Sequence, residues 1–226
     1  MDADPGTLTT NNPTGTRDAS GTCQVCGRHI GIPIPVCFCC RTVASQLGLP
    51  LVPLFALSEY RVGDQGHHRL RAYKDAPVAE VRAWCRGELV AVLARWFARP
   101  ESGWPTIDGA TAVVTAVPSS RRPGPPPAER LIEGVPMLAA HHLRLLARGP
   151  GDGGHLQAGR DAFTLAPGVD RAGLAGLSVL VFDDTTTTGA AAQSAAATLR
   201  LAGARVSGVL VMGRALAPSN GLGSRR

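Results

Sequence analysis

The sequence predicts an α/β fold in which a parallel sheet is flanked by helices and preceded by a small cysteine-rich module. Short apolar runs alternate with Ala- and Leu-rich stretches, and this alternation is typical of parallel strands joined by helices. The strands are expected at 111–117, 179–182 and 206–213, and the helices at 77–98 and 190–202. The separate module is predicted because five of the six cysteines lie close together near the start of the chain.

The chain of 226 residues is 44% apolar, which suffices for one full-sized core and a small accessory module. Its first residues are rich in Asp, Thr, Asn, Gly and Pro, a composition that favours disorder. The predicted organisation is a disordered tail at 1–20, the cysteine module at 21–50, the main domain at 51–215 and a second disordered tail at 216–226.

The cysteine module contains Cys23-Gln-Val-Cys26 and, ten residues later, Cys37-Phe-Cys39-Cys40. Two such pairs can present four thiolates to one zinc ion, and the segment is too short for a core of its own. The predicted ligands of this zinc knuckle are Cys23, Cys26, Cys37 and Cys40, with Cys39 and His29 as reserve ligands. A disulfide pair is the alternative. It is disfavoured in a reducing cytoplasm.

The helix at 77–98 is predicted from apolar residues spaced three or four apart, with arginines on the remaining positions. Those apolar residues are Val78, Val81, Cys85, Leu89, Val92 and Trp96. The pattern predicts an amphipathic helix that faces the core, with Cys85 as a core residue.

The run from Val179 to Phe182 leads into Asp183 and Asp184, then four threonines and Gly189. This order predicts a buried strand, a ligand loop and a helix start. Backbone N–H groups at a helix start bind phosphate, and carboxylates accept hydrogen bonds from vicinal hydroxyls such as those of ribose. The alternative is a turn that only caps the helix, although capping needs one such residue and not six.

The segment resembles the 5-phosphoribosyl-1-pyrophosphate (PRPP) signature of type I phosphoribosyltransferases. The resemblance implies that Asp183 and Asp184 bind the ribose diol, and that PRPP enters with Mg²⁺. The 5'-phosphate loop implied by it is Thr187, Thr188, Gly189 and Ala190, with Thr185 and Thr186 in the variable positions. Ala191 replaces a hydroxyl residue of many members. Thr187 replaces the aspartate of purine-salvage members, which disfavours hypoxanthine or guanine as the acceptor.

A four-cysteine knuckle followed by this signature resembles the ComF family, also described as competence protein F-like proteins. The family has a lysine ahead of its first long helix, which implies that Lys74 reaches a ligand phosphate. A solvated lysine is the alternative. After the strand at 111–117, the resemblance implies a pyrophosphate loop at Ser119, Ser120 and Arg121. The segment 130–134 departs from the family's Arg-Gly-Phe-Asn-Gln pattern.

The glycine-rich segment 148–155 and the following Gln157 and Arg160 loosely resemble the flexible hood that closes over PRPP in type I enzymes. This implies that Arg160, with Lys74 and Arg121, offsets charge on the departing diphosphate. A surface arginine is the alternative reading of Arg160.

The net charge is +6 and the pI is near 9.4, yet the charge is diffuse, so a solubilising surface explains it as well as a nucleic-acid footprint does. No apolar run has the length of a membrane span, and no signal peptide is evident, so we expect a cytoplasmic protein.

The predicted function is transfer of a phosphoribosyl group from PRPP to a nitrogen nucleophile with release of pyrophosphate. One alternative is a non-catalytic ComF-type module that binds single-stranded DNA during uptake or processing. The aromatic content of 4% argues against a platform for base stacking. Another alternative is a regulator that senses PRPP. The acceptor and the oligomeric state stay open.

Overall fold

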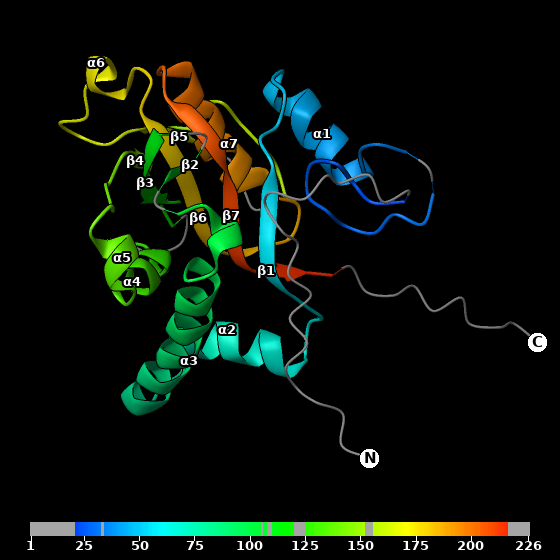
Figure 1. The fold of residues 1–226 in the computed structure, drawn as a ribbon. Coiled ribbons are helices and arrows are strands. Elements are labelled where there is room, and N and C mark those ends of the chain that lie inside the picture. Colours follow the sequence, from blue (N-terminus) through cyan, green and yellow to red (C-terminus); the bar gives the residue numbers. More distant parts are fainter. Residues whose placement is uncertain are drawn as a thin grey trace, which may run out of the picture.

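The computed structural model describes residues 21–32, 34–104, 106–107, 110–119, 125–151 and 156–216. They form a five-stranded sheet of order β1-β7-β6-β3-β2, in which the first four strands are parallel and β2 pairs antiparallel with β3 at one edge (Figure 1). The strands are β1 (Leu54–Tyr60), β2 (Thr106–Ile107), β3 (Ala110–Ala116), β6 (Ser178–Thr186) and β7 (Arg205–Ala215). A separate antiparallel hairpin consists of β4 (Leu146–Arg148) and β5 (Phe163–Leu165).

Helices cover both faces of the sheet, as the sequence predicts (Figure 1). They are α1 (Phe38–Leu47), α2 (Gln65–Asp75), α3 (Ala79–Phe97), α4 (Pro127–Glu133), α5 (Pro136–Ala139), α6 (Arg171–Leu174) and α7 (Ala190–Leu201), with a 3₁₀ turn at Pro100–Ser102. The predicted helix at 190–202 is thus confirmed, and the strands at 111–117 and 206–213 are each matched by a strand of nearly the same bounds. None of the helices in the described ranges is long and apolar enough to cross a membrane.

Strand β6 shows why the sheet needs cover on both faces. Val179 and Val181 pack with α7 and the cysteine module, whereas Leu180 and Phe182 pack with residues of α2, α3 and α4. All four side chains are at most 5% exposed. A run of consecutive apolar residues therefore fits a parallel strand buried on two sides.

The predicted end of this strand is wrong by four residues. β6 runs on to Thr186, because β7 is long enough to pair with it, with Asp183 opposite Val211 and Thr185 opposite Gly213. The two aspartates consequently stand on a strand and not on a loop. Only the short segment before Ala190 connects the strand to α7.

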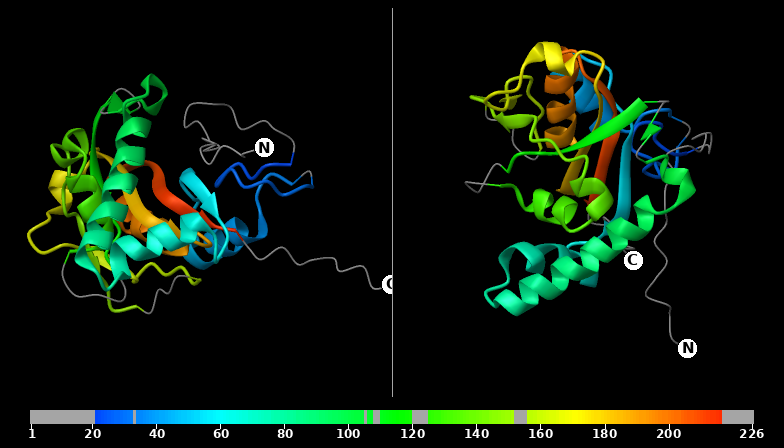
Figure 2. Two further views of the ribbon diagram at one scale, coloured as in Figure 1. Left: turned by 90° about the horizontal axis from the view of Figure 1, so that it is seen from below. Right: turned by 60° about the vertical axis from the view of Figure 1, so that its left-hand side comes forward.

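The amphipathic pattern of α3 is confirmed from Cys85 onward. Cys85, Leu89 and Trp96 are buried, but Val78 and Val81 are 49% and 42% exposed. Figure 2 shows the reason: α2 and α3 project beyond the sheet as an arm, so the first turns of α3 have no sheet to pack against. The spacing of apolar residues along the sequence does not by itself show where a long helix stops contacting the core.

Several predictions made from the sequence fall on residues outside the described ranges. They are the two tails up to residue 20 and from 217, the pyrophosphate-loop residues Ser120 and Arg121, and part of the glycine-rich segment, residues 152–155.

Candidate functional site

The candidate site lies at the edge where the parallel strands end. The Val117 N–H donates to the Phe182 carbonyl at 2.9 Å, so the chain leaving β3 stays beside the end of β6. Ser119 follows two residues later and is half-buried. The segment after β3 and the acidic pair of β6 therefore share one edge, which is where ligands of parallel sheets bind.

Asp184 is the centre of a side-chain network. Its carboxylate accepts a short hydrogen bond from the Tyr73 hydroxyl, pairs with the Lys74 ammonium at 2.7 Å and accepts from the Thr185 hydroxyl at 3.1 Å. The Lys74 ammonium also donates to Thr185 at 3.2 Å. Because Asp184 is only 7% exposed, this network compensates the cost of burying its charge.

Asp183 has a different environment although it is the next residue. It is half-buried, and its carboxylate accepts from the Asp184 N–H at 2.8 Å. Burial, together with the negative charge of Asp184, raises the pKa of Asp183 to about 8. Of the two carboxyl groups, Asp183 has the fewer side-chain partners and is the better placed to accept hydrogen bonds from a ligand.

The segment from Thr187 to Ala190 is held by threonine side chains. The Gly189 N–H donates to the Thr186 hydroxyl oxygen at 2.9 Å, and the Ala190 N–H donates to that of Thr188 at 3.2 Å. The loop therefore carries hydroxyl groups, which can both donate and accept hydrogen bonds, at the start of α7.

Gly189 is required by the shape of this turn. Its φ of 84° lies in the left-handed region, and a Cβ there would approach the Leu54 Cδ1 to 3.0 Å. Glycine adopts this conformation without steric cost. The turn is therefore built around this position.

The four predicted cysteine ligands come together. The sulfur atoms of Cys23, Cys26, Cys37 and Cys40 all lie within 4.8 Å of one another, and all four residues are buried. The Sγ atoms of Cys26 and Cys37 are 3.9 Å apart. A tetrahedral zinc site with Zn–S bonds of about 2.3 Å has sulfur atoms about 3.8 Å apart, so the residues fit zinc.

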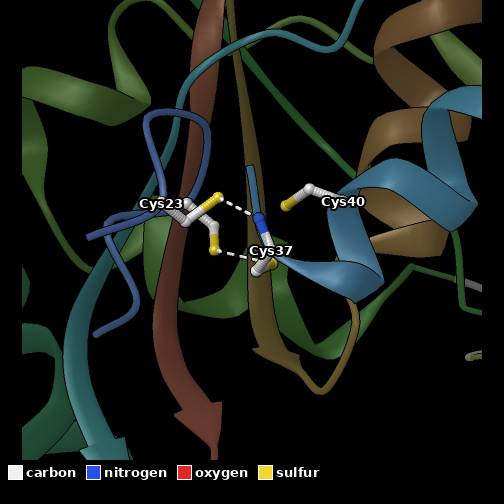
Figure 3. Close-up of side chains that lie close together, drawn as sticks. Cys23, Cys37 and Cys40 are labelled. Carbon is white, nitrogen blue, oxygen red and sulfur yellow. Dashed lines mark hydrogen bonds between the residues drawn. The ribbon is translucent and has the colours of Figure 1, made fainter. Parts of the chain in front are cut away.

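The directions of the side chains support this fit. Figure 3 shows the side chains of Cys23, Cys37 and Cys40 directed toward one another, Cys23 from a loop and Cys40 from α1. The Cys37 N–H also donates to the Cys23 sulfur at 3.3 Å. No disulfide joins the cysteines, so the alternative of a disulfide pair is not realised.

The four thiols influence one another's protonation. Hydrogen bonds from Cys26 and Cys40 lower the pKa of Cys23, and the same contacts raise the pKa of Cys26 to about 11 and raise that of Cys40. The group thus stabilises one thiolate by keeping protons on its neighbours. Four thiolates at this separation require a bound cation, as a structural zinc would provide.

The cysteine module is attached to the sheet through arginines that the sequence analysis does not single out. Arg214, on β7 and 2% exposed, donates short hydrogen bonds to the Cys26 carbonyl and to the Glu59 carboxylate. The guanidinium of Arg28 lies within 3.3 Å of the Thr187 carbonyl oxygen. An arginine in an otherwise apolar strand indicates a buried hydrogen-bond or ion-pair partner. The sequence alone therefore could have predicted such a partner for Arg214.

The three residues predicted to offset the charge on the departing diphosphate lie in different parts of the structure. Lys74 joins the acidic pair, so it does not stand free in solvent as the alternative expects. Arg160 donates to the carbonyls of Leu47 and Gly48 at the end of α1 and not to any residue of the acidic pair. Arg121 lies outside the described residues. Tyr73 is the residue that the sequence analysis misses here, although it directly precedes Lys74.

Comparison with known proteins yields structural resemblance at low identity. No protein-family model matches the chain, and no curated protein matches it. The solved structure of adenine phosphoribosyltransferase from Leishmania tarentolae aligns with a TM-score of 0.37 and 12% identity over 71% of this chain and 91% of that one. The enzyme from Leishmania donovani aligns with a TM-score of 0.34 and 14% identity over 74% and 89%. Superposition this loose supports no conclusion about the site.

Proposed function

We propose that this protein binds PRPP and acts as a phosphoribosyltransferase-like protein of the ComF type. The observation that carries the proposal is the run of Asp183, Asp184 and the threonine segment at one sheet edge, ending at the start of α7. Carboxylates suit a ribose diol and hydroxyl groups at a helix start suit a phosphate, and here they follow one another along the chain.

In the proposed reaction, the bond between C1' and the pyrophosphate oxygen breaks, a nitrogen nucleophile forms a bond to C1', and that nitrogen loses a proton. Asp183 would accept hydrogen bonds from the diol and fix the ribose. The threonine segment would hold the 5'-phosphate, and Ser119, Ser120 and Arg121 would face the diphosphate. Lys74 would hold the Asp184 carboxylate in place beside the developing positive charge on the ribose.

Magnesium would enter with the diphosphate oxygens of PRPP and reduce their charge. Carboxylate oxygens, the ligands that Mg²⁺ prefers, are available at Asp183. Zinc in the cysteine cluster has no proposed part in the reaction. The proposed location is the cytoplasm, a reducing compartment in which zinc-thiolate centres persist.

Turnover is tested by incubating PRPP and Mg²⁺ with a panel of nitrogen bases and measuring pyrophosphate release. The proposal expects release with at least one base, and its loss in Asp183→Ala combined with Asp184→Ala. Saturable PRPP binding without release for any base leaves the PRPP-sensing regulator as the function. Equal release by the double variant would refute the assignment of the site.

Single-stranded DNA binding is the second candidate, and one observation favours it. The arm of α2 and α3 exposes Trp84, which is 61% exposed, together with the basic side chains of Arg71 and Arg86. Aromatic faces and cations suit single strands. A salt-dependent gel shift of an oligonucleotide that survives Asp183→Ala and disappears in Trp84→Ala would support it, and no shift at low salt would exclude it.

A further inference from the structure

Arg28 belongs to the cysteine module through its backbone. Its carbonyl accepts from the Cys23 N–H at 2.8 Å. The backbone of Arg28 is therefore committed to the turn that carries two of the four predicted zinc ligands. Any rearrangement of this turn must move Arg28.

The side chain of Arg28 contacts the sheet domain rather than the cysteine module. Its Nη2 lies 3.3 Å from the Thr187 carbonyl oxygen and 3.3 Å from the Ala215 carbonyl oxygen at the end of β7. A hollow separates the cysteines Cys26 and Cys37 from the segment Thr186 to Gly189, and Arg28 lines it. One residue thus connects the cysteine cluster to the segment proposed to bind phosphate.

The contact to Thr187 has a consequence for the next residue. A peptide unit is planar and trans, so the Thr187 carbonyl and the Thr188 N–H point in opposite directions. By holding the carbonyl toward the cysteine module, Arg28 fixes the Thr188 N–H on the opposite side of the chain. The orientation of a backbone donor within the proposed phosphate segment therefore depends on an arginine from the cysteine module.

The position of Arg28 depends on how well ordered the turn that carries its backbone is. The module is short, and zinc binding is the main source of folding free energy in such segments. We therefore expect loss of the ion to loosen this turn and, with it, the contact of the guanidinium with the Thr187 carbonyl.

We propose that Arg28 is a positioning residue that couples metal occupancy of the four-cysteine cluster to phosphate affinity of the segment Thr187 to Ala190. The identity of the ligand rests on the proposed function. Such coupling is reciprocal, so a ligand that binds more tightly to the zinc-loaded protein also slows zinc loss. Coupling between sites is commonly a factor of about 5 to 150, and we expect on the order of tenfold here.

The test combines hydrogen exchange of the peptide spanning 183–192 with PRPP titration in the full-length protein. The samples are the zinc-loaded protein, the chelator-treated protein, Arg28→Gln and Arg28→Lys. Arg41→Ala is the matched control, since Arg41 lies on α1 and its side chain is exposed. Zinc is quantified in every sample. Because the backbone contact to Cys23 does not involve the side chain, Arg28→Gln is expected to keep stoichiometric zinc.

The expected result is faster exchange in this peptide and on the order of tenfold weaker PRPP binding, both after chelation and in zinc-loaded Arg28→Gln. Arg28→Lys should be intermediate and Arg41→Ala unchanged. Wild-type exchange and affinity in Arg28→Gln would overturn the proposal. So would zinc loss from that variant, which would assign Arg28 to the stability of the module alone. If the wild type binds no PRPP, the proposed function fails, and the exchange arm still decides the coupling.

Discussion

The cysteine cluster and the threonine segment after β6 line one hollow, but different forces hold the two regions. The threonine segment follows β6, whose apolar residues are buried on both faces, and the polar groups of that sheet edge are tied by hydrogen bonds. The turn of the cysteine module instead brings four sulfur atoms together. The sheet edge should therefore fold without metal, whereas the cysteine module should need a bound metal ion to fold.

The largest effect is expected from removal of a zinc ligand. Cys40→Ser should abolish stoichiometric zinc, since the remaining three thiolates leave the tetrahedral site incomplete, and it should lower stability by more than about 3 kcal/mol. Metal analysis and urea unfolding measure this. Cys39→Ser is the matched control and should keep zinc, because Cys39 lies outside the cluster. Zinc retained in Cys40→Ser and lost in Cys39→Ser would reverse the assignment of ligands.

A smaller effect is expected from the acidic pair, and it should be unequal. Asp184→Asn removes the partner of Lys74 and Tyr73 and should cost about 2–3 kcal/mol, since a partly buried ammonium loses its counter-ion. Asp183→Asn should cost less than about 1 kcal/mol, because it keeps an acceptor for the backbone N–H. Urea unfolding at pH 7 compares the two. Equal losses would contradict the difference between the two environments.

The pH dependence of stability should come from Asp183. Its pKa in the folded protein is raised to about 8 from the ordinary 3.8, so between these values the folded state binds a proton that the unfolded chain has released. Its contribution to stability is therefore full below about pH 4 and falls as the pH rises through about 8. Asp183→Asn lacks this titration and should gain stability relative to the wild type from pH 5 to pH 9. Parallel pH profiles of the two proteins would contradict the raised pKa.

The smallest effect is expected at the turn before α7. Gly189→Ala places a side chain at a φ of 84° and close to Leu54, which should cost about 1–2 kcal/mol. Gly87→Ala is the matched control within α3, where a Cβ meets nothing within 4 Å. The control should stabilise the protein by about 0.5–1 kcal/mol. Thermal unfolding of both variants measures the difference, and a stabilising Gly189→Ala would show that the turn tolerates a side chain.

The sequence predicts both regions from local patterns, but it does not predict the contacts between residues that are far apart in the chain. The cysteine cluster follows from local spacing, and the strand, the acidic pair and the start of α7 follow from a run of adjacent residues. The contacts of Tyr73 with Asp184 and of Lys74 with Thr185 each join residues 111 positions apart, and that of Arg28 with Thr187 joins residues 159 apart. No local pattern encodes such pairs, because the tertiary fold decides them. The extension of β6 to Thr186 likewise depends on the length of β7.

The central claim is that the edge formed by Asp183 and the threonine segment binds a ribose 5-phosphate. Calorimetric titration of the zinc-loaded protein with PRPP and Mg²⁺, in parallel with Asp183→Asn, tests it most directly. The account predicts saturable one-to-one binding to the wild type that is weaker by at least about tenfold in the variant, the loss expected when the carboxyl group that accepts from the ribose diol becomes an amide. Absence of binding to the wild type, or equal affinity in the two proteins, would contradict it.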